Sequence, residues 1–214
     1  MFPERCGVCD RPGAALCEGC HAELVRLSPP VCERCGSPGA WPVRRCAECS
    51  GRRLAFVRAR AALVYDDRAR ALVRSWKERG RRRLATQAAQ LVAEQLAPPD
   101  ADVLVAVPGD PERAWRRGDV PPRGLALALG ELWGIPQADL LRRTRSLERQ
   151  RGQSLADRRR NVRGSVEAVA TSPRRVCLVD DVYTSGATAD ACASALRRAG
   201  ARHVDVVTLA RAVR

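Results

Sequence analysis

Val176-Cys-Leu-Val-Asp-Asp-Val-Tyr-Thr-Ser-Gly-Ala-Thr188 is the stretch of this 214-residue sequence that decides the fold. It begins with the short apolar run Val176–Val179, which is typical of a buried strand in a parallel sheet. Two carboxylates and a loop of small residues follow, and the loop leads directly into an alanine-rich segment closed by Gly200 at a C′ position. A strand, a tight loop and a helix in immediate succession indicate a parallel α/β sheet.

The loop in this stretch has the chemistry of a sugar-phosphate site. Gly186 lets the backbone turn tightly, and the loop amides, three hydroxyls and the helix N-terminus can surround an anion. The two carboxylates would repel a phosphate, but they suit ribose hydroxyls or a hydrated Mg²⁺. We therefore expect a site for a 5-phosphorylated ribose, the alternative being a plain strand-to-helix turn with a threonine N-cap. The candidate residues are Asp180, Asp181, Thr184, Ser185, Gly186, Ala187 and Thr188.

The sequence on either side of this stretch continues the alternation of strands and helices. Apolar, β-rich runs predict strands, and helical periodicity of apolar residues predicts helices. Ligands of such open sheets sit at the carboxyl ends of the strands, where the candidate loop lies. The expected strands are Leu54–Tyr65, Asp102–Val107, Arg175–Val179 and Val204–Leu209, and the expected helices are Asp67–Lys77, Arg82–Leu96, Gly124–Leu132 and Thr188–Ala199.

Eight of the ten cysteines lie before residue 50, in four Cys-x-x-Cys pairs. Two such pairs complete a tetrahedral Cys₄ zinc site, so four pairs predict two structural sites with no open position for catalysis. The pairs can combine in order or in a cross-braced arrangement, and the spacing leaves both open. The other two cysteines, Cys177 and Cys192, are expected to be buried apolar residues. The predicted zinc ligands are Cys6, Cys9, Cys17, Cys20, Cys32, Cys35, Cys46 and Cys49.

The composition is strongly basic, with 38 Lys plus Arg against 24 Asp plus Glu and a net charge of +14. This balance favours polyanionic partners such as nucleic acid or phosphorylated metabolites. The alternative is that a GC-rich genome encodes an arginine-rich composition without any such partner. The densest group is Arg142–Arg163, with nine arginines, which fits either a phosphate-binding segment or a solvated loop. No stretch approaches the ~20 apolar residues of a membrane span, and the N-terminus lacks the apolar core of a signal peptide. We therefore expect a cytoplasmic protein without membrane insertion.

The stretch 176–188 is similar to the signature of type I phosphoribosyltransferases. With the four cysteine pairs, the chain resembles the ComF family of double-zinc-ribbon, phosphoribosyltransferase-like proteins linked to DNA uptake and competence. The resemblance implies an α/β fold in which residues 1–53 form a double zinc ribbon and residues 54–214 a parallel-sheet phosphoribosyltransferase-like domain. Further matching segments are Trp76–Gly80, Leu84-Ala85, Val107-Pro108, Arg116–Gly118, Arg142–Arg145, Gln150 and Arg158–Gly164.

The resemblance also implies roles for individual residues. Asp180 and Asp181 would be the catalytic pair that holds the ribose hydroxyls, directly or through Mg²⁺, and Thr184–Thr188 would hold the 5-phosphate of phosphoribosyl pyrophosphate. The segment Val107–Asp110 would take the place of the family's pyrophosphate-side loop, and Arg142–Arg163 would cover the site. Lys77, Val107 and Pro108 complete the implied phosphoribosyl site.

Two segments depart from the family pattern. The family usually has Arg-Gly-Phe-Asn-Gln where this chain has Arg117-Gly118-Asp119-Val120-Pro121-Pro122, and the two prolines are expected to delay the next helix. Gly109-Asp110 replaces the usual Leu-His. Both changes lie on the side of the site away from the ribose phosphate. We therefore expect phosphate binding to be retained and the pyrophosphate or acceptor side to be altered.

Two functions follow as expectations. The first is a Mg²⁺-dependent phosphoribosyltransferase that acts on phosphoribosyl pyrophosphate or a related sugar phosphate, with a link to DNA uptake or DNA processing. The second is a non-catalytic module that binds single-stranded nucleic acid and retains a vestigial phosphoribosyl site. The resemblance implies single-stranded DNA and DNA-uptake proteins as partners in either case.

Overall fold

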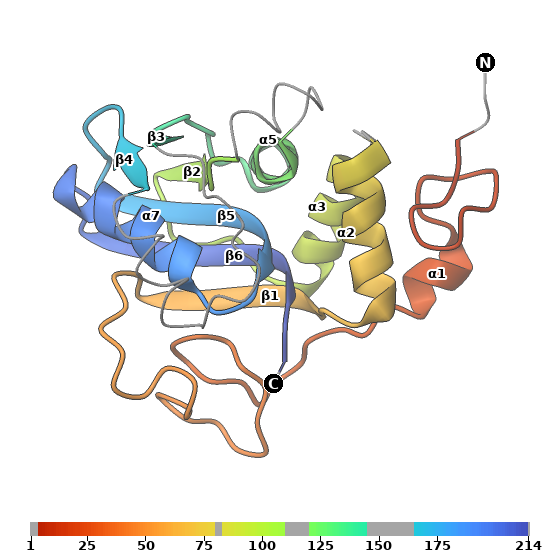
Figure 1. The fold of residues 1–214 in the computed structure, drawn as a ribbon, viewed down its shortest axis with the longest axis horizontal. Coiled ribbons are helices and arrows are strands. Elements are labelled where there is room, and N and C mark those ends of the chain that lie inside the picture. The colour runs from red at the N-terminus through yellow and green to blue at the C-terminus, as the bar shows by residue number, and fades with distance from the viewer. Residues whose placement is uncertain (1–3, 80–82, 110–119, 145–164, 214) are drawn as a thin grey trace.

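A computed structural model of the chain describes residues 4–79, 83–109, 120–144 and 165–213 (Figure 1). At its centre lies a four-stranded sheet with the order β1-β6-β5-β2. All three strand pairings are parallel. The strands are β1 (Arg58–Val64), β2 (Val103–Ala106), β5 (Arg175–Tyr183) and β6 (His203–Arg211). The predicted parallel α/β fold is therefore confirmed.

Helices cover both faces of the sheet because successive side chains of each strand point to opposite faces. Cys177 and Val179 of β5 belong to one apolar core, which they share with the helices α2 (Asp67–Arg79), α3 (Leu84–Gln95) and α5 (Pro121–Trp133). Val176 and Leu178 belong to a second core, which they share with α7 (Ala187–Arg198). Figure 1 shows α2, α3 and α5 on one side of the sheet and α7 on the other.

Chain segments without regular structure cover the two edges of the sheet. Arg26 pairs with Leu63 along the outer edge of β1, and Gln137 pairs with Leu104 along the outer edge of β2. Backbone bonds reinforce the first pairing, since the N–H of Leu27 donates to the carbonyl of Ala62 at 2.8 Å. Covered edges do not offer unpaired backbone groups to other chains.

The Arg142–Arg163 segment begins in the short antiparallel pair β3 (Leu141–Arg143) and β4 (Val166–Ala168). The N–H of Thr144 donates to the carbonyl of Ser165 at 2.9 Å and closes the pair. Residues 145–164 lie outside the described part of the chain, so their predicted role as a cover over the site stays a prediction.

Several elements have other bounds than the sequence predicts, and strand β1, for example, begins at Arg58 instead of Leu54. Strand β5 continues to Tyr183 instead of ending at Val179, because it stays paired with β6 through Tyr183 and Arg211. Helix α5 begins at Pro121, so the expectation that the two prolines delay the helix is wrong. Proline is favoured in the first helical turn, since its missing N–H has no partner there in any helix and its φ angle is already helical.

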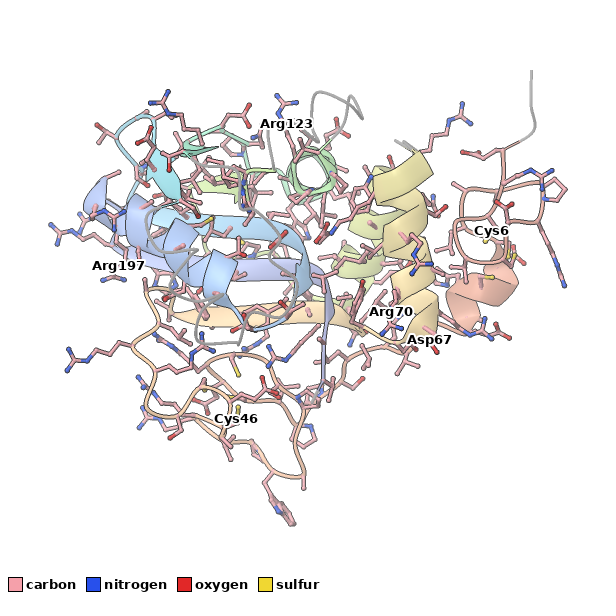
Figure 2. All side chains as sticks on the ribbon, viewed as in Figure 1. Cys6, Cys46, Asp67, Arg70, Arg123 and Arg197 are labelled. Atoms are coloured by element: carbon pink, nitrogen blue, oxygen red, sulfur yellow. The ribbon has the colours of Figure 1, made fainter. Side chains whose placement is uncertain are left out.

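The eight N-terminal cysteines lie in two separate segments. We call residues 4–24 the first ribbon, which contains the short helix α1 (Glu18–Ala22), and residues 31–53 the second ribbon. Figure 2 shows Cys6 of the first ribbon outside helix α2 and Cys46 of the second ribbon below the sheet. A single zinc-binding domain over residues 1–53 remains a prediction, and the two ribbons contribute to different cores.

Candidate functional site

The predicted phosphate loop, Thr184–Thr188, follows β5 directly, and its last two residues form the start of α7. Gly186 is the N-cap residue of α7 and has a left-handed backbone with φ of 72°. A Cβ atom at this position would overlap the Tyr183 hydroxyl and would lie 2.6 Å from the ring carbon Cζ. Only glycine fits here, for both its backbone angle and its close contact. The N-terminus of α7 therefore opens directly from a tight loop, as anion-binding loops require.

The two candidate carboxylates lie within strand β5 and leave it in opposite directions. Asp181 is 5% exposed, and its Oδ2 lies 2.5 Å from the Nζ of Lys77 on α2. Asp180 belongs to the other side of the strand and accepts a hydrogen bond from the N–H of Asp181 at 2.9 Å. Burial and the neighbouring Asp181 charge raise the pKa of Asp180 to about 7, although Lys77 acts in the opposite direction.

The segment after β2 lies beside these carboxylates. The N–H of Val107 donates to the carbonyl of Val179 at 2.9 Å, so Val107 and Pro108 run next to the end of β5. Arg143 of β3 donates from Nε to the carbonyl of Pro108 at 3.1 Å, and its positive charge lowers the pKa of Asp180. The structure therefore brings Lys77, Val107 and Pro108 to the same end of the sheet as the Asp pair.

Sequence reasoning missed three arginines that contact this region. Arg143 stood in the sequence as one member of an arginine-rich run, without a role of its own. Arg52 donates from Nη1 to the carbonyl of Ser185 at 2.8 Å, and Arg211 lies with its guanidinium carbon 4.5 Å from the centre of the Tyr183 ring. No local pattern marks Arg52 or Arg211, because each reaches the loop from a distant part of the chain.

Each ribbon brings four cysteine sulfur atoms together. In both groups all four Sγ atoms lie within 4.8 Å of one another. Zn–S bonds of about 2.3 Å in tetrahedral geometry place the sulfurs about 3.8 Å apart. The observed Sγ–Sγ distances fit this value: 3.8 Å for Cys9 and Cys17, and 3.7 Å for Cys32 and Cys49. The eight predicted ligands thus form two Cys₄ sites that pair in sequence order, not in the cross-braced arrangement.

The backbone around the first cysteine of each group favours a thiolate. Burial would raise the pKa of Cys6, but hydrogen bonds from the backbone of Cys17, Cys9 and Val8 outweigh it and lower the pKa to about 6. Burial is likewise outweighed at Cys32, whose pKa falls to about 7 because of bonds from the backbone of neighbouring residues. Burial raises the pKa of Cys20, Cys35 and Cys49 in the same groups, so the grouping of the sulfur atoms, and not the pKa of single thiols, is what indicates the metal sites.

The remaining two cysteines behave as predicted. Cys177 and Cys192 are both completely buried, and burial raises the pKa of each thiol well above its usual range. Within the described residues, no helix combines the length and apolar character that crossing a bilayer requires.

The chain is similar to known proteins both in its cysteine-rich N-terminal part and over most of its length. The family model described as "Double zinc ribbon domain" matches residues 1–51. The "DNA utilization protein YhgH" of Salmonella typhimurium is 30% identical, and the match covers 98% of this chain and 97% of that protein. The "Competence protein F" of Haemophilus influenzae is 28% identical over 92% of this chain and 90% of that protein. The "Competence protein ComFC" of Streptococcus pneumoniae is 25% identical over 92% and 88% of the two chains.

Solved structures overlap with part of the chain. Glutamine phosphoribosylpyrophosphate amidotransferase from B. subtilis is 28% identical, and the overlap covers 58% of this chain and 25% of that chain with a TM-score of 0.41. Purine phosphoribosyltransferase from Pyrococcus horikoshii is 20% identical over 60% of this chain and 73% of that chain, with a TM-score of 0.37. Overlaps of this size are too partial to identify the fold by themselves.

Proposed function

This chain belongs to the family of competence protein F and the DNA utilization protein YhgH, and we propose that it binds phosphoribosyl pyrophosphate or a related ribose 5-phosphate. The proposed site comprises the loop Thr184–Thr188, the carboxylates Asp180 and Asp181, and Lys77, Val107 and Pro108. The names of the relatives support a role in competence or DNA utilization, in which the sugar phosphate would be a ligand of the protein.

The tight loop at Gly186 is the observation that carries this proposal. It joins the end of a buried parallel strand directly to the N-terminus of α7, where backbone amides and the helix dipole favour a phosphate. Asp181 and its partner Lys77 lie at the same end of the sheet. The helix N-terminus suits a phosphate, the carboxylates suit ribose hydroxyls and Lys77 adds a positive charge, and these groups together support a ribose phosphate as the ligand.

We further propose that Mg²⁺ accompanies the ligand. Asp180 and Asp181 are hard oxygen donors of the kind that Mg²⁺ prefers, and the ion would neutralise the charge of the pyrophosphate group. Transfer of the phosphoribosyl group to an acceptor would then depend on electrostatic positioning, which requires no protein nucleophile. The family resemblance assigns the altered segments Gly109-Asp110 and Gly118–Pro122 to the pyrophosphate or acceptor side, and residues 110–119 lie outside the described part of the chain. We therefore propose binding as the primary function.

Calorimetry tests the proposed ligand. We expect heat on adding phosphoribosyl pyrophosphate with Mg²⁺ to the wild type, and loss of that heat in an Asp180→Asn/Asp181→Asn variant. Asp67→Asn is the matched control, because Asp67 is an exposed carboxylate that pairs with Arg70 on α2. Absence of binding by the wild type, to both phosphoribosyl pyrophosphate and ribose 5-phosphate, would sink the proposal. Release of pyrophosphate on adding candidate acceptors would demonstrate turnover.

A second candidate function is the binding of single-stranded nucleic acid through the second ribbon. Trp41 is 77% exposed and lies close in sequence to the exposed Arg44 and Arg45, whereas Trp76 is buried and cannot stack on a base. An exposed aromatic ring beside arginines is the arrangement by which proteins hold unpaired bases and their phosphates. The net charge of +14 also favours binding to the phosphate backbone of a nucleic acid.

A labelled single strand tests this second function. We expect binding that weakens steeply between two salt concentrations, and a further loss in Trp41→Ala. Trp76 is unsuitable as a control because it is part of the core, so Val43→Ala, an exposed apolar change in the same loop, serves instead. Salt-independent binding, or none, would remove nucleic acid as a direct partner. Both functions fit a cytoplasmic protein, where the cysteines stay reduced and available to zinc.

A further inference from the structure

Arg52 connects the second ribbon to the phosphate loop. It follows the zinc ligand Cys49 by three residues, and its N–H donates to the carbonyl of Cys49 at 3.2 Å. Its side chain donates from Nη1 to the carbonyl of Ser185 at 2.8 Å. The carbonyl orientation at Ser185 determines how the following amides of the loop point. A residue anchored beside the zinc site thus holds the backbone of the loop.

Arg211 makes a second connection from the end of β6. It is 1% exposed, its Nη1 donates to the carbonyl of Cys35 at 2.7 Å, and its Nη2 lies 2.6 Å from Oε2 of Glu48. Cys35 is a zinc ligand, and Glu48 lies in sequence between the ligands Cys46 and Cys49. A buried arginine that binds a carbonyl and a carboxylate at once has little freedom to move.

The same arginine supports the loop through Tyr183. Tyr183 and Arg211 are register partners in the pair β5–β6, and the guanidinium carbon lies 4.5 Å from the centre of the tyrosine ring. The Tyr183 hydroxyl in turn occupies the space where a side chain of Gly186 would stand. Contacts therefore run without a gap from Glu48 through Arg211 and Tyr183 to the turn of the phosphate loop.

Helix α7 is attached to the chain that leaves the second ribbon. The N–H of Ala55 donates to Oδ1 of Asp190 in the first turn of α7 at 2.7 Å. Phe56 packs edge-to-face on Tyr183, with ring centres 6.3 Å apart. The loop and the helix N-terminus that follows it are consequently held from one side by the same short segment.

The first ribbon makes its contacts elsewhere. A Cβ atom on Gly7 would lie 3.0 Å from side-chain atoms of Leu72 on α2 and Leu84 on α3. Arg83, next to α3, pairs with Glu4 at 3.2 Å, and both groups reach solvent. These contacts stabilise the helical layer of the fold, on the far side of α2 from the sheet (Figure 2).

We propose that the second zinc ribbon holds the phosphate loop in its binding conformation, with Arg52 and Arg211 as positioning residues, and that the first ribbon does not. Metal loss from the second site alone then loosens residues 184–190 and weakens the binding of a sugar phosphate. The effect on affinity rests on the proposed function, whereas the effect on the loop conformation does not.

Arg52→Ala tests this proposal, with Arg5→Ala as the matched control. Arg5 donates from Nη1 to the carbonyl of Asp10 at 2.9 Å within the first ribbon, so the same charge is removed next to the other zinc site. Zinc content is measured for each variant, and two ions per chain are expected in both. We expect amide hydrogen exchange in residues 184–190 to rise about tenfold in Arg52→Ala, and affinity for ribose 5-phosphate to fall roughly five- to tenfold. Arg5→Ala should leave both within about twofold.

A second variant tests the buried contacts between Arg211 and the second ribbon. Arg211→Ala breaks a buried ion pair and is expected to impair folding, so Glu48→Gln is used instead. This variant weakens the pair but keeps an amide oxygen as an acceptor for the buried guanidinium. Faster exchange in residues 184–190 is expected in this variant too.

The outcomes separate the two claims. Unchanged exchange in both Arg52→Ala and Glu48→Gln overturns the role of the second ribbon, even where the wild type binds the sugar phosphate. If the wild type binds no sugar phosphate but exchange rises in these variants, the coupling stands and the proposed function fails.

Discussion

The two zinc ribbons share a motif but differ in how they are attached to the α/β domain. The first ribbon meets α2 and α3 through apolar side chains and the exposed pair of Arg83 with Glu4. The second ribbon is attached at two points. The buried Arg211 at the end of β6 binds the carbonyl of Cys35 in the ribbon, and Arg52 of the ribbon binds the carbonyl of Ser185 in the loop. Two metal sites with the same four cysteine ligands can therefore have different roles in the fold, because the role depends on which part of the α/β domain the surrounding side chains contact.

Removal of one zinc site at a time should give the largest difference between the two ribbons. Cys35→Ser and Cys6→Ser each replace a buried ligand and should each lose one zinc ion, with a loss of several kcal/mol of stability. We expect sugar-phosphate affinity to fall more than tenfold in Cys35→Ser and to change by less than about twofold in Cys6→Ser. Among the described residues it is the second ribbon that contacts the loop, through Arg52. Zinc analysis and calorimetry measure both effects. Equal losses of affinity would contradict the difference between the ribbons.

Removal of the ion pairs should give the next largest difference. Arg211→Ala leaves Glu48 and the Cys35 carbonyl without their buried partner, and we expect a loss of about 3–5 kcal/mol in the free energy of unfolding. Arg83→Ala breaks an exposed pair and should cost no more than about 1 kcal/mol. Urea denaturation followed by circular dichroism measures both. A loss in Arg83→Ala as large as in Arg211→Ala would count against the buried attachment.

Glycine substitutions probe how closely each ribbon approaches the domain. Gly36 of the second ribbon has φ of 68°, and a Cβ atom there would lie 2.6 Å from the carbonyl oxygen of Ala59. We expect Gly36→Ala to cost about 2–4 kcal/mol, since a paired backbone cannot move aside. Gly7→Ala would meet only leucine side-chain tips at 3.0 Å and should cost about 1 kcal/mol.

Gly51→Ala is the control for backbone strain in the previous comparison. Its φ is 70°, and a Cβ atom at this position has open space around it. We therefore expect about 1 kcal/mol for Gly51→Ala, from the left-handed backbone alone. Thermal or urea denaturation of the three variants separates strain from contact, and equal losses in Gly36→Ala and Gly51→Ala would remove the close approach as the cause.

The smallest effect concerns the pH dependence of stability that Asp180 produces in β5, the strand that leads into the loop contacted by the second ribbon. Burial and Asp181 raise the pKa of Asp180 to about 7, so the folded protein holds this proton more tightly than the unfolded chain. The stabilising effect of the protonated group is complete below the unfolded pKa, near 3.9, and is lost as the pH rises through about 7.

Asp180→Asn should remove this dependence. Between pH 6.5 and pH 8 we expect the wild type to lose on the order of 1 kcal/mol relative to the variant, with the difference growing as the pH rises. Urea denaturation at several pH values measures it, and Asp67→Asn should run parallel to the wild type. A difference that stays constant over this pH range would mean that Asp180 is ionised throughout.

Patterns of neighbouring residues were sufficient to predict much of this protein. The run Val176–Val179 is too apolar for a surface strand, so it predicted a buried parallel strand, and Gly186 predicted the tight turn. The spacing of the cysteines predicted two Cys₄ sites. Each of these features depends on residues within a few positions of one another, where the chain geometry leaves little choice.

Other features depended on contacts between distant segments. The ends of β5 and α5 were misjudged because strand pairing with β6, and the tolerance of a first helical turn for proline, outweigh local composition. The order of the zinc pairs was open for the same reason, since spacing allows both arrangements and only the folded backbone brings Cys9 next to Cys17.

The composition and local patterns of this chain were enough to predict two thiolate zinc sites and a parallel α/β sheet, and they are the basis for proposing that the loop binds a phosphate. Only the tertiary structure decided which ribbon supports that loop. Cys35 and Arg211 are 176 positions apart in the chain, and an arginine at the end of a strand has no local signal for its partner. The pairing forms because burial makes an unpaired guanidinium costly, so the fold must bring it a carbonyl and a carboxylate.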